Sequence, residues 1–245
     1  MIPTIDAAEV PHLSTDQMVE VDRAMIEDYG IDLVRMMENA GRALAHLARE
    51  RFLSGVAEGR HIVSLAGSGG NGGGVLVAAR RLHNYGAQVT ALVTKAGESL
   101  TPVARDQLAI LRNMGVAIGD AEDAGHLEAA HLVLDGLIGY SLRGAPRGAA
   151  ATLIRWANEQ TAPVLSLDAP SGVDTTTGIV LEPAIEATAT LTLALPKGGL
   201  RNPDVEKNVG DLYLADISVP PKLYARFLGM EVPPIFAKSD IVQLV

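Results

Sequence analysis

The pattern of hydrophobic and polar positions along the chain predicts two helices, followed by strands that alternate with further helices. Residues 14–29 begin with the spacing of a capping box and place Met18 and Met25 on one helical face. Apolar residues recur at helical spacing again over 33–47. From His61 onward, short apolar runs alternate with helical patterns, which is typical of a parallel, doubly wound sheet. We therefore predict an α/β fold: a three-layer αβα Rossmann-like sandwich, with a largely parallel central sheet and the two N-terminal helices packed on it.

The expected strands and helices fill the chain between a short arm and a short tail. Strands are predicted over residues 61–65, 88–94, 131–135, 163–168, 187–195 and 211–217. Helices are predicted over 75–85, 101–114 and 222–228, near 121–130, and from the end of a loop at 139–148 through Trp156. We expect residues 1–13 to form an extended arm and residues 229–245 an irregular tail. Because no repeat or linker-like stretch divides the chain, we expect a single domain over 1–245.

A glycine-rich stretch stands between the first strand of this series and the helix expected from Val75. Six of the eight residues over 67–74 are glycine, and so many glycines are not expected inside a regular element because of their conformational entropy. A strand, a glycine loop and a helix in this order leave free backbone N–H groups at the N-terminus of the helix, where phosphate or another anion binds. A tight turn would need only one or two glycines, so we favour a phosphate-binding loop.

The common nucleotide-binding motifs do not fit this loop. Gly67, Gly69 and Gly72 have the spacing of the dinucleotide fingerprint, but that fingerprint also needs an acidic residue at the end of the next strand. Here that strand, 88–94, runs into Lys95. The Gly-Lys-Ser/Thr sequence of a P-loop is missing as well. The sequence therefore argues against an ordinary NAD dehydrogenase and against a P-loop kinase or ATPase.

Polar residues follow two further strands at their carboxyl ends. Asp135 ends one apolar run and Asp168 ends another, with Ser171 three residues later. Ligands of such sheets bind outside the carboxyl ends of the strands, and a partly desolvated carboxylate there has a pKa suited to proton transfer or cation binding. Singly, each aspartate could merely cap a loop; together with the glycine loop, they favour a functional site. Arg143 is a candidate anion ligand, and Lys197 fits a surface position and a site position equally well.

Composition narrows the class of protein. The apolar fraction of 48% is ample for a core, and an aromatic fraction of 4% makes that core aliphatic. A formal charge of −9 argues against nucleic acid or an anionic membrane as a partner. Cysteine is absent, so thiolate chemistry and disulfides are excluded. The N-terminal residues do not resemble a signal peptide and no apolar run has membrane-spanning length, so we expect a cytoplasmic protein.

Several motifs in this order resemble the NAD(P)H-hydrate epimerase family, that of the YjeF-type N-terminal domain, over roughly residues 12 to 228. The resemblance lies in Met37-Glu-Asn-Ala-Gly41, in Gly67-Ser-Gly69 with Asn71-Gly72-Gly73, and in Ala78-Ala-Arg80. It lies also in Asp135-Gly-Leu-Ile-Gly139 followed by Leu142-Arg-Gly144, in Leu167-Asp-Ala-Pro-Ser-Gly-Val-Asp174, and in Leu195-Pro-Lys-Gly-Gly199.

This resemblance implies an isomerase that interconverts the R and S forms of hydrated NADH and NADPH at C6 of the nicotinamide ring, in nicotinamide cofactor repair. It implies a bound potassium ion with Asn71, Asp135 and Ser171 as ligands. The residues that would bind the substrate are Gly70, Asn71, Gly72, Gly73, Gly74, Gly139, Tyr140, Ser141, Leu142, Arg143 and Asp168. The expected partner is thus the small-molecule substrate, hydrated NADH or NADPH. A homodimer is one assembly that the protein could form.

The chain departs from the family at the glycine loop, which usually reads Asn-Asn-Gly-Gly-Asp-Gly. Here Gly70 replaces the first Asn, Gly74 the Asp, and Val75 the last Gly. The alternative function, a non-catalytic nucleotide-binding or scaffold module of the same fold, is favoured by Gly74. For an active enzyme, we assign proton transfer to Asp168, with Asp135 holding the cation or sharing the proton transfer.

Overall fold

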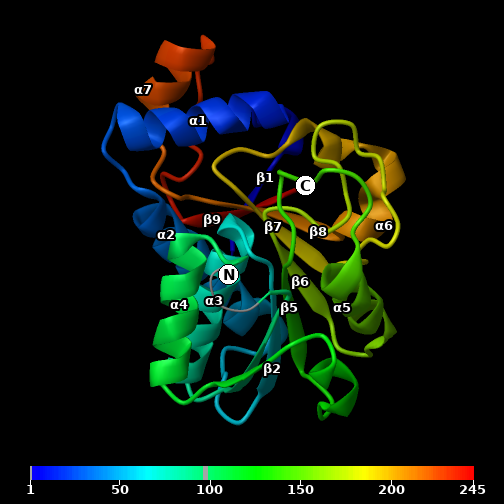
Figure 1. The fold of residues 1–245 in the computed structure, drawn as a ribbon. Coiled ribbons are helices and arrows are strands. Elements are labelled where there is room, and N and C mark those ends of the chain that lie inside the picture. Colours follow the sequence, from blue (N-terminus) through cyan, green and yellow to red (C-terminus); the bar gives the residue numbers. More distant parts are fainter. Residues whose placement is uncertain (1, 96–98) are drawn as a thin grey trace.

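The central element of the computed structural model, which describes residues 2–95 and 99–245, is a nine-stranded sheet in the order β1-β9-β8-β7-β6-β5-β2-β3-β4 (Figure 1). All neighbouring strands are parallel except β8 and β9. The strands are β1 Thr4–Ile5, β2 His61–Ala66, β3 Gln88–Val93, β4 Ala117–Gly119, β5 Leu132–Gly136, β6 Val164–Leu167, β7 Ala189–Leu193, β8 Asp211–Ala215 and β9 Ile241–Leu244.

Helices cover both faces of the sheet. In Figure 1, α2, α3 and α4 lie on one face and α5 on the other, while α1 crosses above the sheet. The helices are α1 Thr15–Glu27, α2 Leu33–Leu47, α3 Gly70–Asn84, α4 Pro102–Asn113, α5 Gly148–Glu159, α6 Glu206–Val209 and α7 Pro221–Leu223. Short turns of helix are η1 Ala7–Glu9, η2 Ala48–Phe52, η4 Asp123–His126, η5 Gly198–Arg201, η6 Pro203–Val205 and η7 Tyr224–Leu228.

Two hydrophobic cores fill the spaces between the three layers. Side chains of a strand alternate between the two faces of a sheet, so Ile62 packs into the core beneath α2, α3 and α4, and Val63 into the core beneath α5. Leu132 and Val133 of β5 divide in the same way. The three-layer fold predicted from the sequence is confirmed, and no helix in the described part of the chain is long and apolar enough to cross a membrane.

The sheet reverses its direction of growth between β2 and β5. After β2 the chain adds β3 and β4 on one side, then returns to place β5 on the other side of β2, with Leu65 beside Asp135. Such a switch point leaves a crevice at the carboxyl ends of the two strands, because their connections leave in opposite directions. The glycine-rich stretch follows β2 and the loop from 137 follows β5, so both border this crevice.

Helix α3 begins at Gly70, whereas the sequence predicts a loop through Gly74. The glycines are inside the helix because neighbouring atoms leave no room for side chains. A Cβ on Gly72 would lie 1.9 Å from the backbone oxygen of Gly67, and one on Gly73 would lie 2.6 Å from Met37 Sδ. Close packing therefore outweighs the entropy that argues against glycine in a helix.

Three other segments differ from the prediction. The stretch near 121–130 contains only the short turn η4, and the unpredicted strand β4 precedes it. The tail expected to be irregular ends in β9, which pairs with β8 and also with β1 in the expected arm, whose first residue lies outside the described part. Short strands of this kind carry little local signal, because pairing with distant strands stabilises them.

Candidate active site

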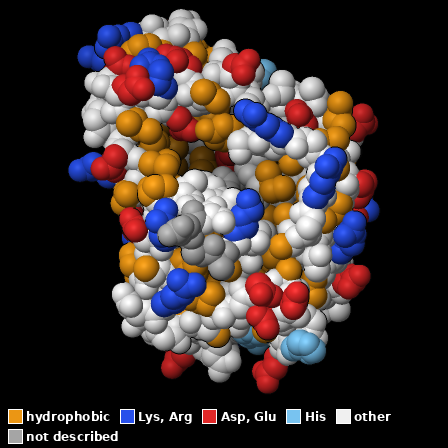
Figure 2. Space-filling view, viewed as in Figure 1, with side chains coloured by type: hydrophobic (Ala, Val, Ile, Leu, Met, Phe, Trp, Pro, Cys, Tyr) orange, Lys and Arg blue, Asp and Glu red, His pale blue; other side chains and the backbone are white. Residues whose placement is uncertain are grey.

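A cavity of about 500 Å³ lies at the crevice, between the carboxyl ends of β2, β5, β6 and β7 and helix α1. Figure 2 shows its mouth as a hollow below α1 with hydrophobic side chains around the rim. Its walls are mostly aliphatic, and its polar side chains come from five separate parts of the chain. The residues that line it include Met18, Asp22, Ile26, Met37, Asn71, Tyr140, Leu167, Asp168 and Lys197.

The N-terminus of α3 forms one side of the cavity. The first N–H groups of α3, at Gly70, Asn71 and Gly72, have no partner within the helix, as at the start of any helix. The N-cap residue, Gly69, has no side chain that could accept a hydrogen bond from them. Ser68, Gly69, Gly70, Asn71 and Gly72 all line the cavity. Free N–H groups at a helix N-terminus bind anions, and their position here supports the phosphate-binding role predicted for this stretch.

Asp168 and Lys197 form a buried ion pair at the cavity. Lys197 Nζ contacts Asp168 Oδ1, and it also donates to the backbone oxygen of Leu193 at 3.0 Å. The two side chains are 3% and 0% exposed. The backbone φ of Asp168 is +67°, a left-handed conformation that aspartate tolerates better than most residues. Asp168 is therefore held rigidly at the end of β6, as a carboxylate whose charge is balanced.

Asp135 lies behind the cavity wall and does not line it, which differs from the catalytic role expected for it. Its Oδ1 accepts from Leu137 N at 3.1 Å and Ser171 Oγ at 2.6 Å, and its Oδ2 accepts from Ser166 Oγ at 2.8 Å and Ser171 N at 2.9 Å. Complete burial raises the pKa of Asp135, against these hydrogen bonds, which lower it. Its contacts join the ends of β5 and β6, so a part in proton transfer stays a prediction.

Asn71 and Ser171 complete the set of residues expected to hold a cation. Asn71 Nδ2 donates to the backbone oxygen of Leu167 at 2.7 Å. Its amide packs so closely on the next loop that a Cβ on Gly139 would lie 2.5 Å from Asn71 Oδ1. Ser171 Oγ lies 3.2 Å from the backbone oxygen of Ile138 as well as beside Asp135. Oxygen donors of this kind suit a hard cation, and the cation site stays a prediction.

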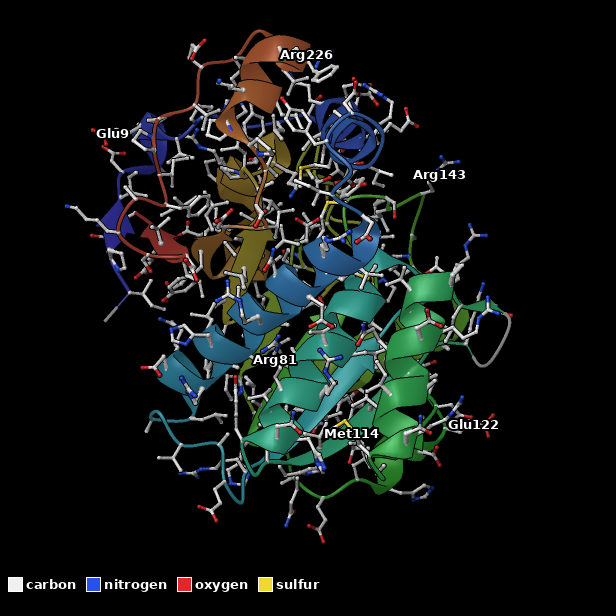
Figure 3. The ribbon with its side chains drawn as sticks, turned by 90° about the vertical axis from the view of Figure 1, so that its left-hand side faces the viewer. Glu9, Arg81, Met114, Glu122, Arg143 and Arg226 are labelled. Atoms are coloured by element: carbon white, nitrogen blue, oxygen red, sulfur yellow. The ribbon has the colours of Figure 1, made fainter. Side chains whose placement is uncertain are left out.

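The expected substrate loop after β5 is divided by the structure. Gly139, Tyr140 and Ser141 line the cavity, whereas Leu142 and Arg143 do not. Arg143 is exposed, and Figure 3 shows its side chain pointing away from the molecule. Arg143 therefore lies outside the cavity lining, and its contact with phosphate stays a prediction.

The sequence alone does not identify Asp22 as a site residue, and it leaves Lys197 between a surface position and a site position. Asp22 of α1 lines the cavity and accepts a hydrogen bond of 2.5 Å from the hydroxyl of Tyr140. Burial raises the pKa of Asp22, the Tyr140 hydrogen bond and Lys197 lower it, and Asp168 raises it, with a net increase. The signal available in the sequence is an acid between Met18 and Ile26 at a spacing of four residues, which puts all three on one helical side. Lys197 is placed in the site.

Fold and site together define an α/β protein with a ligand cavity at the switch point of its sheet. The chain belongs to the family of the YjeF-related protein N-terminus, whose model matches residues 34–199. A crystal structure of the yeast protein ynu0, YNL200c, has a TM-score of 0.82 over 96% of this chain and 100% of that one, at 23% sequence identity. That likeness supports the fold.

Particular relatives carry names that describe an activity. The chain is 40% identical over 223 residues to the NAD(P)H-hydrate epimerase of Dehalogenimonas lykanthroporepellens, covering 91% of this chain and 88% of that protein. It is 32% identical to the NAD(P)H-hydrate epimerase of Rhodopirellula baltica, over 89% of each. The bifunctional NAD(P)H-hydrate repair enzyme Nnr of Salinibacter ruber is 36% identical over 86% of this chain, which spans 41% of that longer protein.

Proposed function

We propose that this protein is an NAD(P)H-hydrate epimerase, which interconverts the R and S forms of hydrated NADH and NADPH at C6 of the nicotinamide ring. The observation that carries the proposal is the meeting of an uncapped helix N-terminus and a buried Asp168–Lys197 pair in one cavity. The first suits a phosphate group and the second suits acid–base chemistry. Relatives named for this activity support the proposal.

The cavity would take the substrate with its phosphate against α3 and its nicotinamide ring against Asp168. Aliphatic side chains such as Met37 and Leu167 would pack on the ring, and the N–H groups of Gly70, Asn71 and Gly72 would bind phosphate. The cavity volume of about 500 Å³ suits part of a dinucleotide, so the remainder would lie toward the open mouth. Shape and apolar walls therefore orient the ring, and the polar groups act on C6.

The chemistry at C6 is loss and return of water. The C6–oxygen bond breaks as the ring nitrogen N1 supplies electrons, which gives a planar iminium-like carbon, and water then adds to the other face. Such a step needs groups that protonate the departing oxygen and deprotonate the arriving water. Asp168, fixed by Lys197 and open to the cavity, is the candidate for one of these transfers.

A potassium ion held by Asn71, Asp135 and Ser171 is part of the proposal. The oxygen donors of these residues suit that ion, and it would supply a positive charge near the loop that follows β5, which favours an anionic ligand. With a nucleotide present, potassium chloride should raise the Tm above the value in the same concentration of sodium chloride. An identical Tm in the two salts would contradict the cation site.

An epimerisation assay on separated R and S substrate tests the function. Wild-type protein should interconvert the forms faster than buffer alone, and in isotope-labelled water the product should carry the solvent oxygen at C6. Asp168→Asn should abolish interconversion while binding of NADP is kept. Because this variant leaves Lys197 unpaired, Asp168→Asn with Lys197→Met serves as a second variant without the buried charge. Normal turnover in either folded variant would contradict the assignment.

A non-catalytic nucleotide-binding or scaffold module is not favoured. This alternative rests on Gly74, which stands where the family has an aspartate. A Cβ at Gly74 would lie 2.6 Å from Leu167 Cδ2. The leucine side chain thus occupies the space that an aspartate would need, and the cavity keeps its other polar groups. We also propose a cytoplasmic location, and a homodimer as the assembly to be tested by light scattering.

A further inference from the structure

We propose that Asp22 is a second catalytic carboxylate, which acts on the face of the nicotinamide ring opposite to Asp168. This assignment rests on the proposed epimerase function. It begins from the chemistry of inversion: the hydroxyl leaves one face of the ring and the new oxygen arrives on the other. Each face therefore needs its own proton donor or acceptor within hydrogen-bond reach.

Asp168 cannot serve both faces from its position. Its carboxylate contacts Lys197, its backbone N–H donates to Leu191 O at 2.7 Å, and its side chain is 3% exposed. A group held by contacts at both its backbone and its side chain reaches one side of a bound ring. The second group must come from another wall of the cavity.

Among the described residues that line the cavity, four have titratable side chains: Asp22, Tyr140, Asp168 and Lys197. Lys197 is fully buried and its ammonium group is used by Asp168 and by Leu193 O. Burial first, and then the charge of Asp22, raise the pKa of Tyr140, whose hydroxyl already donates to Asp22. Asp22 is therefore the group left for the second proton transfer.

Asp22 comes from a different element and faces the cavity from a different wall. It lies on α1, which crosses above the sheet, whereas Asp168 and Lys197 follow the carboxyl ends of β6 and β7 (Figure 1). Met18 and Ile26, one turn before and after it, line the same cavity. Its apolar surroundings raise its pKa toward the range in which a carboxyl group both donates and accepts protons.

The proposed reaction balances with these two groups. The carboxyl group on the first face gives its proton to the C6 hydroxyl; the C6–oxygen bond breaks, its electron pair leaves with the oxygen as water, and N1 supplies an electron pair to C6. A water on the second face then forms the new C6–oxygen bond, the electron pair of the C6=N1 double bond returns to N1, and the water gives its proton to the other carboxylate. One proton thus passes from one aspartate to the other, and the reverse reaction returns it.

Asp22→Asn and Tyr140→Phe together separate a catalytic role from a structural one. In Asp22→Asn the amide oxygen still accepts the Tyr140 hydrogen bond, but the side chain cannot carry a proton, so kcat should fall at least about 100-fold with little change in KM or Tm. Tyr140→Phe leaves the carboxylate in place and removes a hydrogen bond that lowers its pKa. Activity should then fall less than about tenfold, and the limb of the pH–rate profile that belongs to Asp22 should move to higher pH.

The pH dependence of the rate also reflects the titratable and charged groups around Asp22. These are Tyr140, Lys197 and Asp168, and Tyr224 at the start of η7, whose pKa is raised by burial and by the charges of Asp216 and Asp22. In Asp22→Asn one limb of the profile should disappear, whereas a merely structural role would leave both limbs in place.

Each outcome decides the assignment. An active wild type with an equally active Asp22→Asn variant overturns the role of Asp22 and leaves the proposed function standing. Tyr140→Phe that loses as much activity as Asp22→Asn, with an unchanged pH profile, makes Asp22 a residue that positions the loop and overturns the assignment. A wild type that does not interconvert the substrate overturns the proposed function and this assignment with it.

Discussion

At the scale of single residues, two buried aspartates of the site differ in what balances them. Asp168 is neutralised by a cation, Lys197. Asp135 instead accepts hydrogen bonds from the hydroxyls of Ser166 and Ser171 and from two backbone N–H groups. A buried charge is costly unless it is paired or hydrogen-bonded. The two arrangements therefore respond differently to substitution, and each leads to a prediction.

Lys197→Met leaves the carboxylate of Asp168 buried without its cation. Loss of one partner of a buried pair costs about 3–5 kcal/mol, so we expect this fall in the free energy of unfolding, measured with urea. Adding Asp168→Asn removes the remaining charge, and asparagine also tolerates the positive φ at this position. The double variant should recover more than half of the loss, and no recovery would contradict the ion pair.

Asp135→Asn should lower the free energy of unfolding by about 1–3 kcal/mol. Each oxygen of Asp135 accepts from one backbone N–H, that of Leu137 or that of Ser171, so either orientation of the amide sets its NH₂ against a donor. Asp174→Asn is the matched control, because Asp174 Oδ1 alone accepts from Thr176 N, Thr177 N and Thr177 Oγ. Equal effects of the two substitutions in urea titrations would contradict this explanation.

At the scale of elements, the glycines at the start of α3 differ in how closely neighbouring atoms pack against them. Gly72 and Gly73 let α3 approach the turn after β2 and Met37 of α2, while Gly69 has open space around it. Figure 3 shows α2, α3 and α4 side by side on one face. The salt bridge of 2.6 Å between Glu38 and Arg80 ties α2 to α3, and Gln107 of α4 donates to the same carboxylate.

Gly72→Ala should therefore destabilise the protein, whereas Gly70→Ala should not. The new Cβ at 72 would lie 1.9 Å from a backbone oxygen, which must move, and we expect a loss of more than about 2 kcal/mol. At 70 the nearest atom is Met37 Cε at 3.6 Å, an ordinary contact, and alanine is the better helix former. Thermal unfolding should show a lower Tm for the first variant and an equal or higher Tm for the second; a stable Gly72→Ala would contradict the close approach.

At the scale of the whole molecule, the last strand joins the two ends of the chain to the sheet. β9 lies between β1 and β8, and Ile241, Val242 and Leu244 are buried. Its pairing with β8 covers an edge that would otherwise expose unpaired backbone groups. The C-terminal segment thus contributes to the sheet, although none of its residues lines the cavity.

Deletion of residues 238–245 should lower the Tm by at least about 5 °C, because three buried apolar side chains and the pairing of β8 are lost. Chromatography should also show larger species formed through the uncovered edge. Deletion of residues 1–5, which removes only the two-residue strand β1, is the control and should have the smaller effect. A Tm unchanged by the longer deletion would contradict this role of β9.

The sequence by itself determined the order of the main strands and helices, the α/β class and the stretch that borders the cavity. These follow from hydrophobic periodicity and from local residue types, which act between near neighbours. The tertiary structure decided what those residues contact. Asp22 and Tyr140 are 118 positions apart, and Lys197 reaches Asp168 only because β6 and β7 are adjacent in the sheet. The glycines of α3 likewise show their use only against Gly67 and Met37. Contacts between distant segments depend on how the layers pack, and no local pattern in the chain encodes that packing.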